Sequence, residues 1–161
     1  MDVDEKYRKK LARQVELAFD KSQYPGDDKI VAHPNTSISS HLPALLAGKH
    51  WKELTLEVII QENLSLPLLT SEGFRFYLPA FLRAALLFPD QVDILPSNIF
   101  SSLTPPDEEE IQMRDFLNRV NEFTQEQIEA IKSFVKMYVA IESSYPDARR
   151  DKAISFWEQK G

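Results

Sequence analysis

The sequence predicts an all-α fold, a single domain over residues 1–161 with about seven or eight helices, several of them short, around a Pro-kinked central helix at 70–88. Apolar residues recur at helical spacing through most of the chain, and no alternating β-branched run indicates a strand. The composition, 43% hydrophobic and 27% charged over 161 residues, suits one soluble core. The connections are short, and no linker divides the chain.

The first helix is predicted over about 4–21, because apolar residues recur along one face of an otherwise charged segment. These residues are Tyr7, Leu11, Val15, Ala18 and Phe19. The turn-forming run from Tyr24 to Asp28 ends this helix. Ile30 and Val31 anchor the loop that follows, and they indicate a short extended piece.

Two short helices are predicted next. Ser40 is the expected N-cap of a helix over 41–47, and Gly48 is the residue that closes it. Thr55 is the expected cap of a second helix, which ends near residue 61.

The central helix is predicted over 70–88, where the side chains are apolar on nearly every side. Thr70 or Ser71 caps its start. Pro79 removes one backbone donor and displaces the carbonyl of Arg75, which predicts a kink. The alternative is a pair of abutting helices, with Pro79 as the first residue of the second.

One helix is predicted on each side of a double proline. Pro96 opens a short helix, which ends at Pro105-Pro106. Asp107 is the expected cap of the next helix. Its apolar face consists of Ile111, Met113, Phe116, Leu117 and Val120.

The strongest local sequence pattern marks the start of the helix after Thr124. Thr124 and Gln127 form a capping box, and Phe123 with Ile128 forms a hydrophobic staple. A last helix is predicted over 147–159, with three apolar residues that recur at helical spacing.

Several blocks of the sequence resemble one known family. The most specific is Phe74-Arg75-Phe76-Tyr77-Leu78-Pro79-Ala80-Phe81-Leu82, and weaker blocks are Trp51-x-x-Leu54, Phe123-Thr124-x-x-Gln127 and Ala153-Ile154-x-x-Trp157. Together they resemble a bacterial family known only as a domain of unknown function. Its signature is Phe-Arg-(Tyr/Phe)-Tyr-Leu-Pro-Ala-(Tyr/Phe)-Leu, in which Phe76 replaces the more frequent tyrosine. The resemblance supports the fold and implies no activity, cofactor or catalytic residue.

Composition argues against several classes of protein. The net charge of −6 makes a nucleic-acid binder a poor expectation, because that affinity comes mainly from Lys and Arg on phosphates. The absence of cysteine excludes disulfides and thiolate metal sites. No signal-peptide core and no apolar run of roughly 18 residues is visible. We therefore expect a cytoplasmic protein without a membrane partner.

Two arginines lie on the otherwise apolar central helix. Arg75 and Arg83 are offset by about 80° around the helix axis, so they share one side. A buried guanidinium needs a partner, and an ion pair with a neighbouring helix or a side chain that reaches solvent would supply one. The functional alternative is a small-molecule or anion-binding cleft beside the Pro79 kink, formed by Arg75, Arg83 and the Tyr77 hydroxyl.

The stretch 105–127 is strongly acidic, with seven Asp/Glu and two Lys/Arg. Glu108, Glu109, Glu110 and Asp115 could bind a basic protein partner and steer its approach. The competing interpretation is a solvated face that keeps the protein soluble. The leading hypothesis is a non-enzymatic protein-interaction module, for which an immunity- or antitoxin-like inhibitor of a basic toxin is one example.

Catalytic and metal-binding motifs are weak. The sequence has no nucleophile elbow, and its four glycines are too scattered to form a phosphate loop. His50 and Glu53 could form half of a carboxylate–histidine metal site, but the second half is absent, and His33 and His41 lie in loop-rich sequence. We therefore expect no catalytic residue, metal or cofactor, and the sequence leans against an enzyme.

Overall fold

The computed structural model describes residues 3–107, 110–142 and 147–160. This part of the chain contains eight α-helices and two short 3₁₀ helices, and one isolated bridge pairs Val31 with Leu69. The helices are α1 (Val3–Ala18), α2 (Leu42–Leu46), α3 (Leu56–Gln61), α4 (Ser71–Leu87), α5 (Leu95–Ser102), α6 (Glu110–Val120), α7 (Gln125–Ile141) and α8 (Asp147–Lys160), and the 3₁₀ helices are η1 (Trp51–Glu53) and η2 (Leu66–Leu68). The all-α fold is confirmed.

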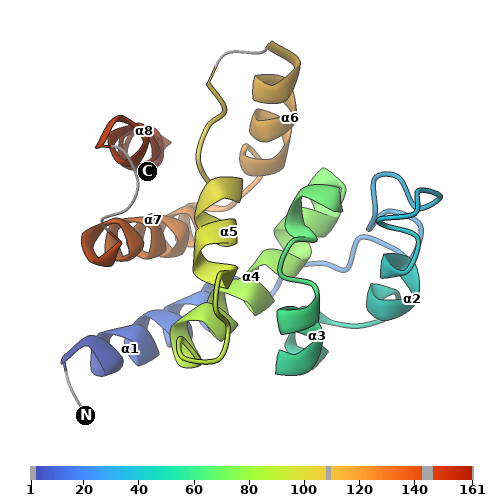
Figure 1. The fold of residues 1–161 in the computed structure, drawn as a ribbon, viewed down its shortest axis with the longest axis horizontal. Coiled ribbons are helices and arrows are strands. Elements are labelled where there is room, and N and C mark those ends of the chain that lie inside the picture. Colours follow the sequence, from blue (N-terminus) through green and yellow to red (C-terminus); the bar gives the residue numbers. More distant parts are fainter. Residues whose placement is uncertain (1–2, 108–109, 143–146, 161) are drawn as a thin grey trace.

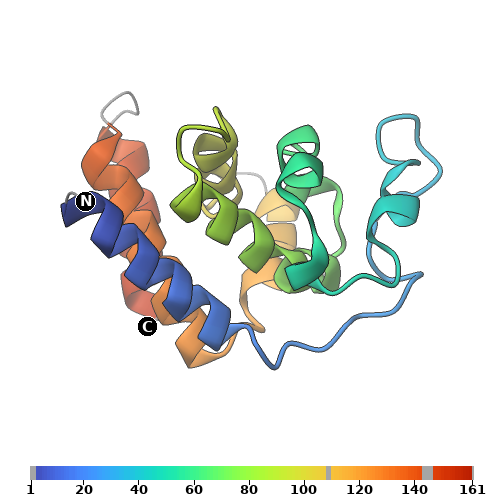
Figure 2. The same cartoon turned by 90° about the horizontal axis from the view of Figure 1, so that it is seen from below.

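Helix α4 lies at the centre, and the other elements pack around it (Figure 1). It contacts α1, α3, α5, α6 and both 3₁₀ helices. Figure 2 shows α1 and α7 on one side of α4, and α2 and α3 on the other. One continuous cluster of buried apolar side chains connects these elements.

The sequence of α4 explains its central place. Thr70 caps the helix, because its Oγ1 accepts a hydrogen bond from Gly73 N at 2.9 Å. Apolar side chains are buried on nearly every side, as predicted. The helix continues through Pro79, so the alternative of two abutting helices is wrong. A kink at Pro79 stays a prediction.

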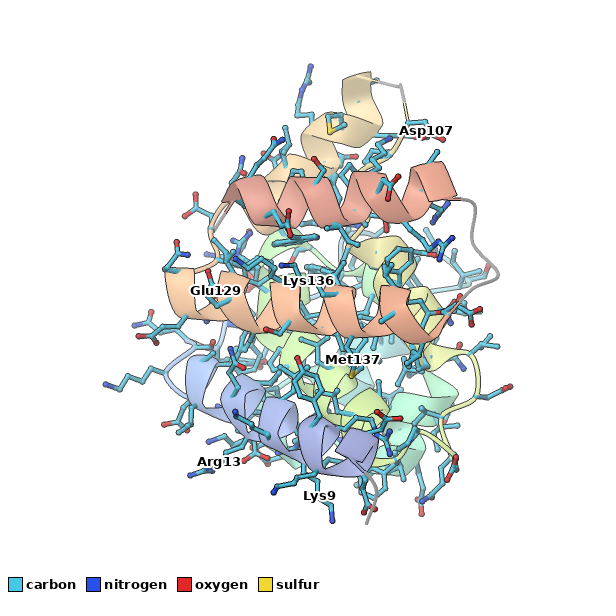
Figure 3. The ribbon with its side chains drawn as sticks, turned by 90° about the vertical axis from the view of Figure 1, so that its left-hand side faces the viewer. Lys9, Arg13, Asp107, Glu129, Lys136 and Met137 are labelled. Carbon is cyan, nitrogen blue, oxygen red and sulfur yellow. The ribbon has the colours of Figure 1, made fainter. Side chains whose placement is uncertain are left out.

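Helices α1, α7 and α8 lie one above another on one side of the molecule (Figure 3). Helix α7 contacts both α1 and α8. The predicted capping box at its start is confirmed: Gln127 N donates to Thr124 Oγ1 at 3.2 Å, and Thr124 N donates to Gln127 Oε1 at 3.0 Å. On the outer surface, Lys136 Nζ and Glu158 Oε1 form an ion pair at 2.8 Å between α7 and α8.

Three local predictions are wrong. Tyr7 was expected on the buried face of α1, but 45% of it is exposed, and Ile111 of α6 is 68% exposed. Ile111 lies about 180° around the helix axis from the face that Phe116 and Val120 bury, and Tyr7 lies at the edge of the buried face of α1. Ser40 does not cap α2: His41 holds the N-cap position without a side-chain bond. Gly48, in contrast, follows the helix end with a φ of 76°, as a closing glycine should.

Within the described residues, no helix is long and apolar enough to cross a membrane.

Candidate functional site

The structure gives Arg75 a capping role. Its Nη1 donates to the carbonyl oxygens of Asn118 at 2.8 Å and Arg119 at 3.2 Å. These carbonyls lie in the last turn of α6, where a helix has acceptors without intrahelical donors and a negative dipole end. Arg75 therefore joins α4 to the end of α6.

Tyr77 and Arg83 contact other parts of the molecule. The Tyr77 hydroxyl lies 2.7 Å from Leu46 O and 2.8 Å from Lys49 O, and burial raises the pKa of this tyrosine above its usual range. The Arg83 guanidinium lies over the Trp51 ring, 5.1 Å from its centroid. Within the described part of the chain, neither arginine of α4 forms the ion pair that was one expectation.

The three residues of the predicted cleft are therefore not brought together. Arg75 lines a wide cavity of about 940 Å³ beside the end of α1, and neither Tyr77 nor Arg83 lines it. A ligand at these three residues stays a prediction.

The predicted acidic face is described only in part. Glu108 and Glu109 lie outside the described residues, and Glu110 begins α6 but has no described side chain. Asp115 is exposed and lines two cavities. A role for the three glutamates in partner binding stays a prediction.

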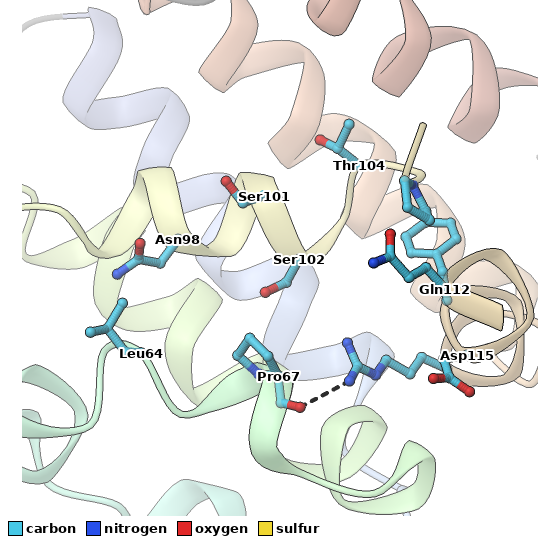
Figure 4. Close-up of a pocket in the computed structure, with 11 residues that line it drawn as sticks. Leu64, Pro67, Asn98, Ser101, Ser102, Thr104, Gln112 and Asp115 are labelled. Carbon is cyan, nitrogen blue, oxygen red and sulfur yellow. Dashed lines mark hydrogen bonds between the residues drawn. The ribbon is translucent and has the colours of Figure 1, made fainter. Parts of the chain in front are cut away.

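Two adjoining cavities, of about 380 and 390 Å³, share Pro67, Asp115 and Arg119 as lining residues. The first lies between α5, α6 and the segment around η2 (Figure 4). The second lies between the 32–39 loop, η2 and the start of α4. We call these two cavities together the Arg119 groove.

Arg119 occupies the shared wall of the groove. Its Nη2 donates to Pro67 O at 2.9 Å, which is the dashed line in Figure 4, and its guanidinium lies 5.6 Å from the centroid of the Phe74 ring. Burial lowers the pKa of Arg119, and the negative charge of Asp115 opposes this effect. Burial therefore makes the positive charge costly, and a negative group in the groove would relieve that cost.

Exposed apolar side chains line both cavities of the groove. Leu64, which lines the first cavity, is 67% exposed, and Ile38, which lines the second, is 66% exposed. A partner segment that covered the groove would bury apolar surface from both side chains.

Contacts from α8 and the core fix the walls of the first cavity. Lys152 Nζ donates to Pro106 O at 2.8 Å and to Asp107 Oδ1 at 2.9 Å. This hydrogen bond and the lysine charge lower the pKa of Asp107, which was expected to cap α6. Trp157 Nε1 donates to Leu103 O at 2.7 Å, which holds the chain just after α5.

Two of the three histidines, His50 and His41, have structural side-chain partners. His50 Nδ1 accepts from Lys52 N at 3.1 Å, and Glu53 Oε1 accepts from His50 N at 2.9 Å, so this pair caps η1. His41 Nε2 lies 2.8 Å from Glu62 Oε1, which also accepts from Ser65 Oγ at 2.7 Å. Within the described residues, no cluster of three or more potential metal ligands exists.

A comparison with known protein families matches residues 32–161, which span α2 to α8. The chain belongs to this family. Its description is "Family of unknown function (DUF6714)". Every residue that lines the Arg119 groove lies within the match to DUF6714, whereas α1 lies outside it. No curated protein and no solved structure gives a significant match.

The sequence prediction missed Arg119, although a signal was present. Arg119 lies three residues after Phe116 and directly before Val120, at the edge of the apolar face of the helix. An arginine at the edge of an apolar face can lay its aliphatic stem along that surface, and this is the signal that marked Arg119.

Proposed function

We propose that the protein is a non-enzymatic protein-interaction module, which binds a segment of a partner protein in the Arg119 groove. One observation carries the proposal: two adjoining cavities share a half-buried arginine, and an exposed apolar side chain lines each of them. An extended segment can place one side chain in each cavity and its backbone across Pro67.

The charge of the chain favours a basic partner. The net charge of the whole chain is −6, so its surface as a whole favours a partner of positive charge. A basic protein would approach such a surface faster at low salt, because its charges are attracted over about 10 Å before contact. An immunity- or antitoxin-like inhibitor would be one such module; this class, the bacterial origin and the cytoplasmic location stay predictions.

The alternative of a ligand site at Arg75, Tyr77 and Arg83 has less support. The first two already bind carbonyl oxygens, and the third lies on Trp51. A ligand would have to displace these contacts.

Affinity capture from the native host tests the proposed function with matched variants. Leu64→Asp and Ile38→Asp each place a charge in the groove. Ile141→Asp makes the same change at the end of α7, on a side chain that is 65% exposed. We expect one partner to bind the wild type and Ile141→Asp, to be lost from both groove variants, and to bind more weakly at high salt. Equal capture by all variants would contradict the proposal.

A further inference from the structure

Resting on the proposed function, we propose that the first cavity of the Arg119 groove binds the chain-terminal carboxylate of the partner, with the apolar side chain of its last residue beside it. The shape, the donors and the unbalanced charge of this cavity support the proposal.

The charge of Arg119 is not balanced by a close anion. Within the part of the chain that the structure describes, this arginine forms no ion pair, and its hydrogen bond goes to the neutral carbonyl of Pro67. Asp115 lies one helical turn earlier and contributes only through its more distant charge. Arginine has five N–H donors in a fixed fork that matches a carboxylate, so most of this capacity remains available.

Two further donors face the same cavity from facing elements. Ser102 of α5 and Gln112 of α6 both line it, and Figure 4 shows them on opposite sides of the space between the two helices. Neither side chain is hydrogen-bonded to another described residue. A hydroxyl and an amide beside a guanidinium can complete the hydrogen bonding of two carboxylate oxygens.

Apolar side chains form the rest of the wall. Leu64, Pro67 and Phe116 line the cavity together with these donors. A chain-terminal residue carries a carboxylate and a side chain on one Cα, so a single residue can present both groups to one cavity of about 380 Å³. An internal Asp or Glu would need a second residue to supply the apolar group.

Three short peptides test this assignment by NMR titration of the isotope-labelled protein. Acetyl-Gly-Leu has a free carboxylate, acetyl-Gly-Leu-amide has none, and acetyl-Glu-Leu-amide has only an internal one. We expect the free acid to shift the signals of Ser102, Gln112 and the Arg119 guanidinium, and to bind at least about tenfold more tightly than either amide. Equal binding of the free acid and its amide, no shift at the groove, or equal binding of the internal carboxylate would overturn the assignment.

Variants at Asp115 and Arg119 should change the affinity for the free acid in opposite directions. Asp115→Asn removes a repulsive charge and should tighten binding of the free acid severalfold without changing binding of its amide. Arg119→Gln should weaken the free acid at least about tenfold, whereas Arg114→Gln removes a charge from the same helix outside the cavity lining and should have little effect. Arg119 also contacts Phe74, so its replacement can disturb the packing. Ser102→Ala is therefore a milder second variant, and it should weaken binding of the free acid without changing binding of the amide. An Asp115→Asn protein with unchanged affinity for the acid would contradict the proposal.

The two proposals can fail separately. If Leu64→Asp abolishes partner capture but the peptide acid and amide bind alike, the groove is an interface and the carboxylate assignment is wrong. If the free acid binds at Arg119 but the groove variants capture the partner as well as the wild type does, the carboxylate site exists without the proposed interface.

Discussion

At the scale of single residues, Tyr77 places a phenol hydroxyl deep in the core. This hydroxyl reaches two carbonyl oxygens at the end of α2, and it has one proton to donate to them. Tyr77 therefore fixes the 46–49 segment against α4, and its role in the described structure is to hold this junction.

Tyr77→Phe should lower the free energy of unfolding by about 1–3 kcal/mol at neutral pH, because two buried carbonyls lose a donor. Burial raises the pKa of Tyr77 above the value of about 10 in the unfolded chain. The stabilisation is therefore complete below about pH 10 and is lost as the pH rises further. Urea unfolding should show the difference between wild type and variant narrowing above about pH 10. Tyr7→Phe, at an exposed tyrosine, is the control. If the loss of unfolding free energy in Tyr77→Phe does not change with pH, the buried hydroxyl is not the cause of the stabilisation.

Gly73 lies where the start of α4 passes close to the backbone of Ile30, in the loop before α2. A Cβ at this position would lie 2.4 Å from Ile30 O, a backbone atom that also accepts from Thr70 N at 2.9 Å. Alanine favours a helix over glycine by about 1 kcal/mol, but this clash can be relieved only if the Ile30 backbone moves.

Gly73→Ala should therefore destabilise the protein by about 1–3 kcal/mol, despite the better helix former. Thermal unfolding measures the change, with Glu72→Ala at the exposed neighbouring position as the control. A Gly73→Ala protein as stable as wild type would mean that the backbone of Ile30 moves at no cost.

At the scale of elements, α7 is the helix whose start depends most clearly on local sequence. Thr124→Ala removes the side-chain acceptor of the capping box and should cost about 1 kcal/mol. Thr124→Ser keeps the acceptor and should restore most of this loss, as measured by urea unfolding. If the serine variant is as unstable as the alanine variant, the methyl group of Thr124 rather than its hydroxyl stabilises the helix start.

Such local signals explain which elements the sequence could predict. The cap of α4, the capping box of α7 and the closing Gly48 depend on residues within one turn, and all three are confirmed. Ile111 was misplaced because its apolar character was weighed without its angle: at about 100° per residue it lies on the opposite side of α6 from Phe116 and Val120. The groove could not be predicted, because its walls come from separate segments near residues 32–39, 64–71, 98–106 and 112–119.

At the scale of the whole molecule, the central α4 joins two regions with different roles. On one side, α1, α7 and α8 pack together and bury the apolar faces of α4 and α7. On the other, α5, α6 and the segments around η2 surround the Arg119 groove. Arg75 links the central helix to the groove, because its hydrogen bonds to the carbonyl oxygens of Asn118 and of Arg119 itself hold the end of α6 against α4.

Site-specific photo-crosslinking in the native host tests the central claim most directly. A benzophenone amino acid replaces Ile38, Leu64 or, as the control of matched exposure, Ile141. We predict that the same partner protein is crosslinked from both groove positions and not from Ile141, and that the crosslinked peptide from Leu64 lies at the partner's C-terminus. A partner crosslinked from Ile141 but from neither groove position would contradict the claim that the Arg119 groove is the binding site.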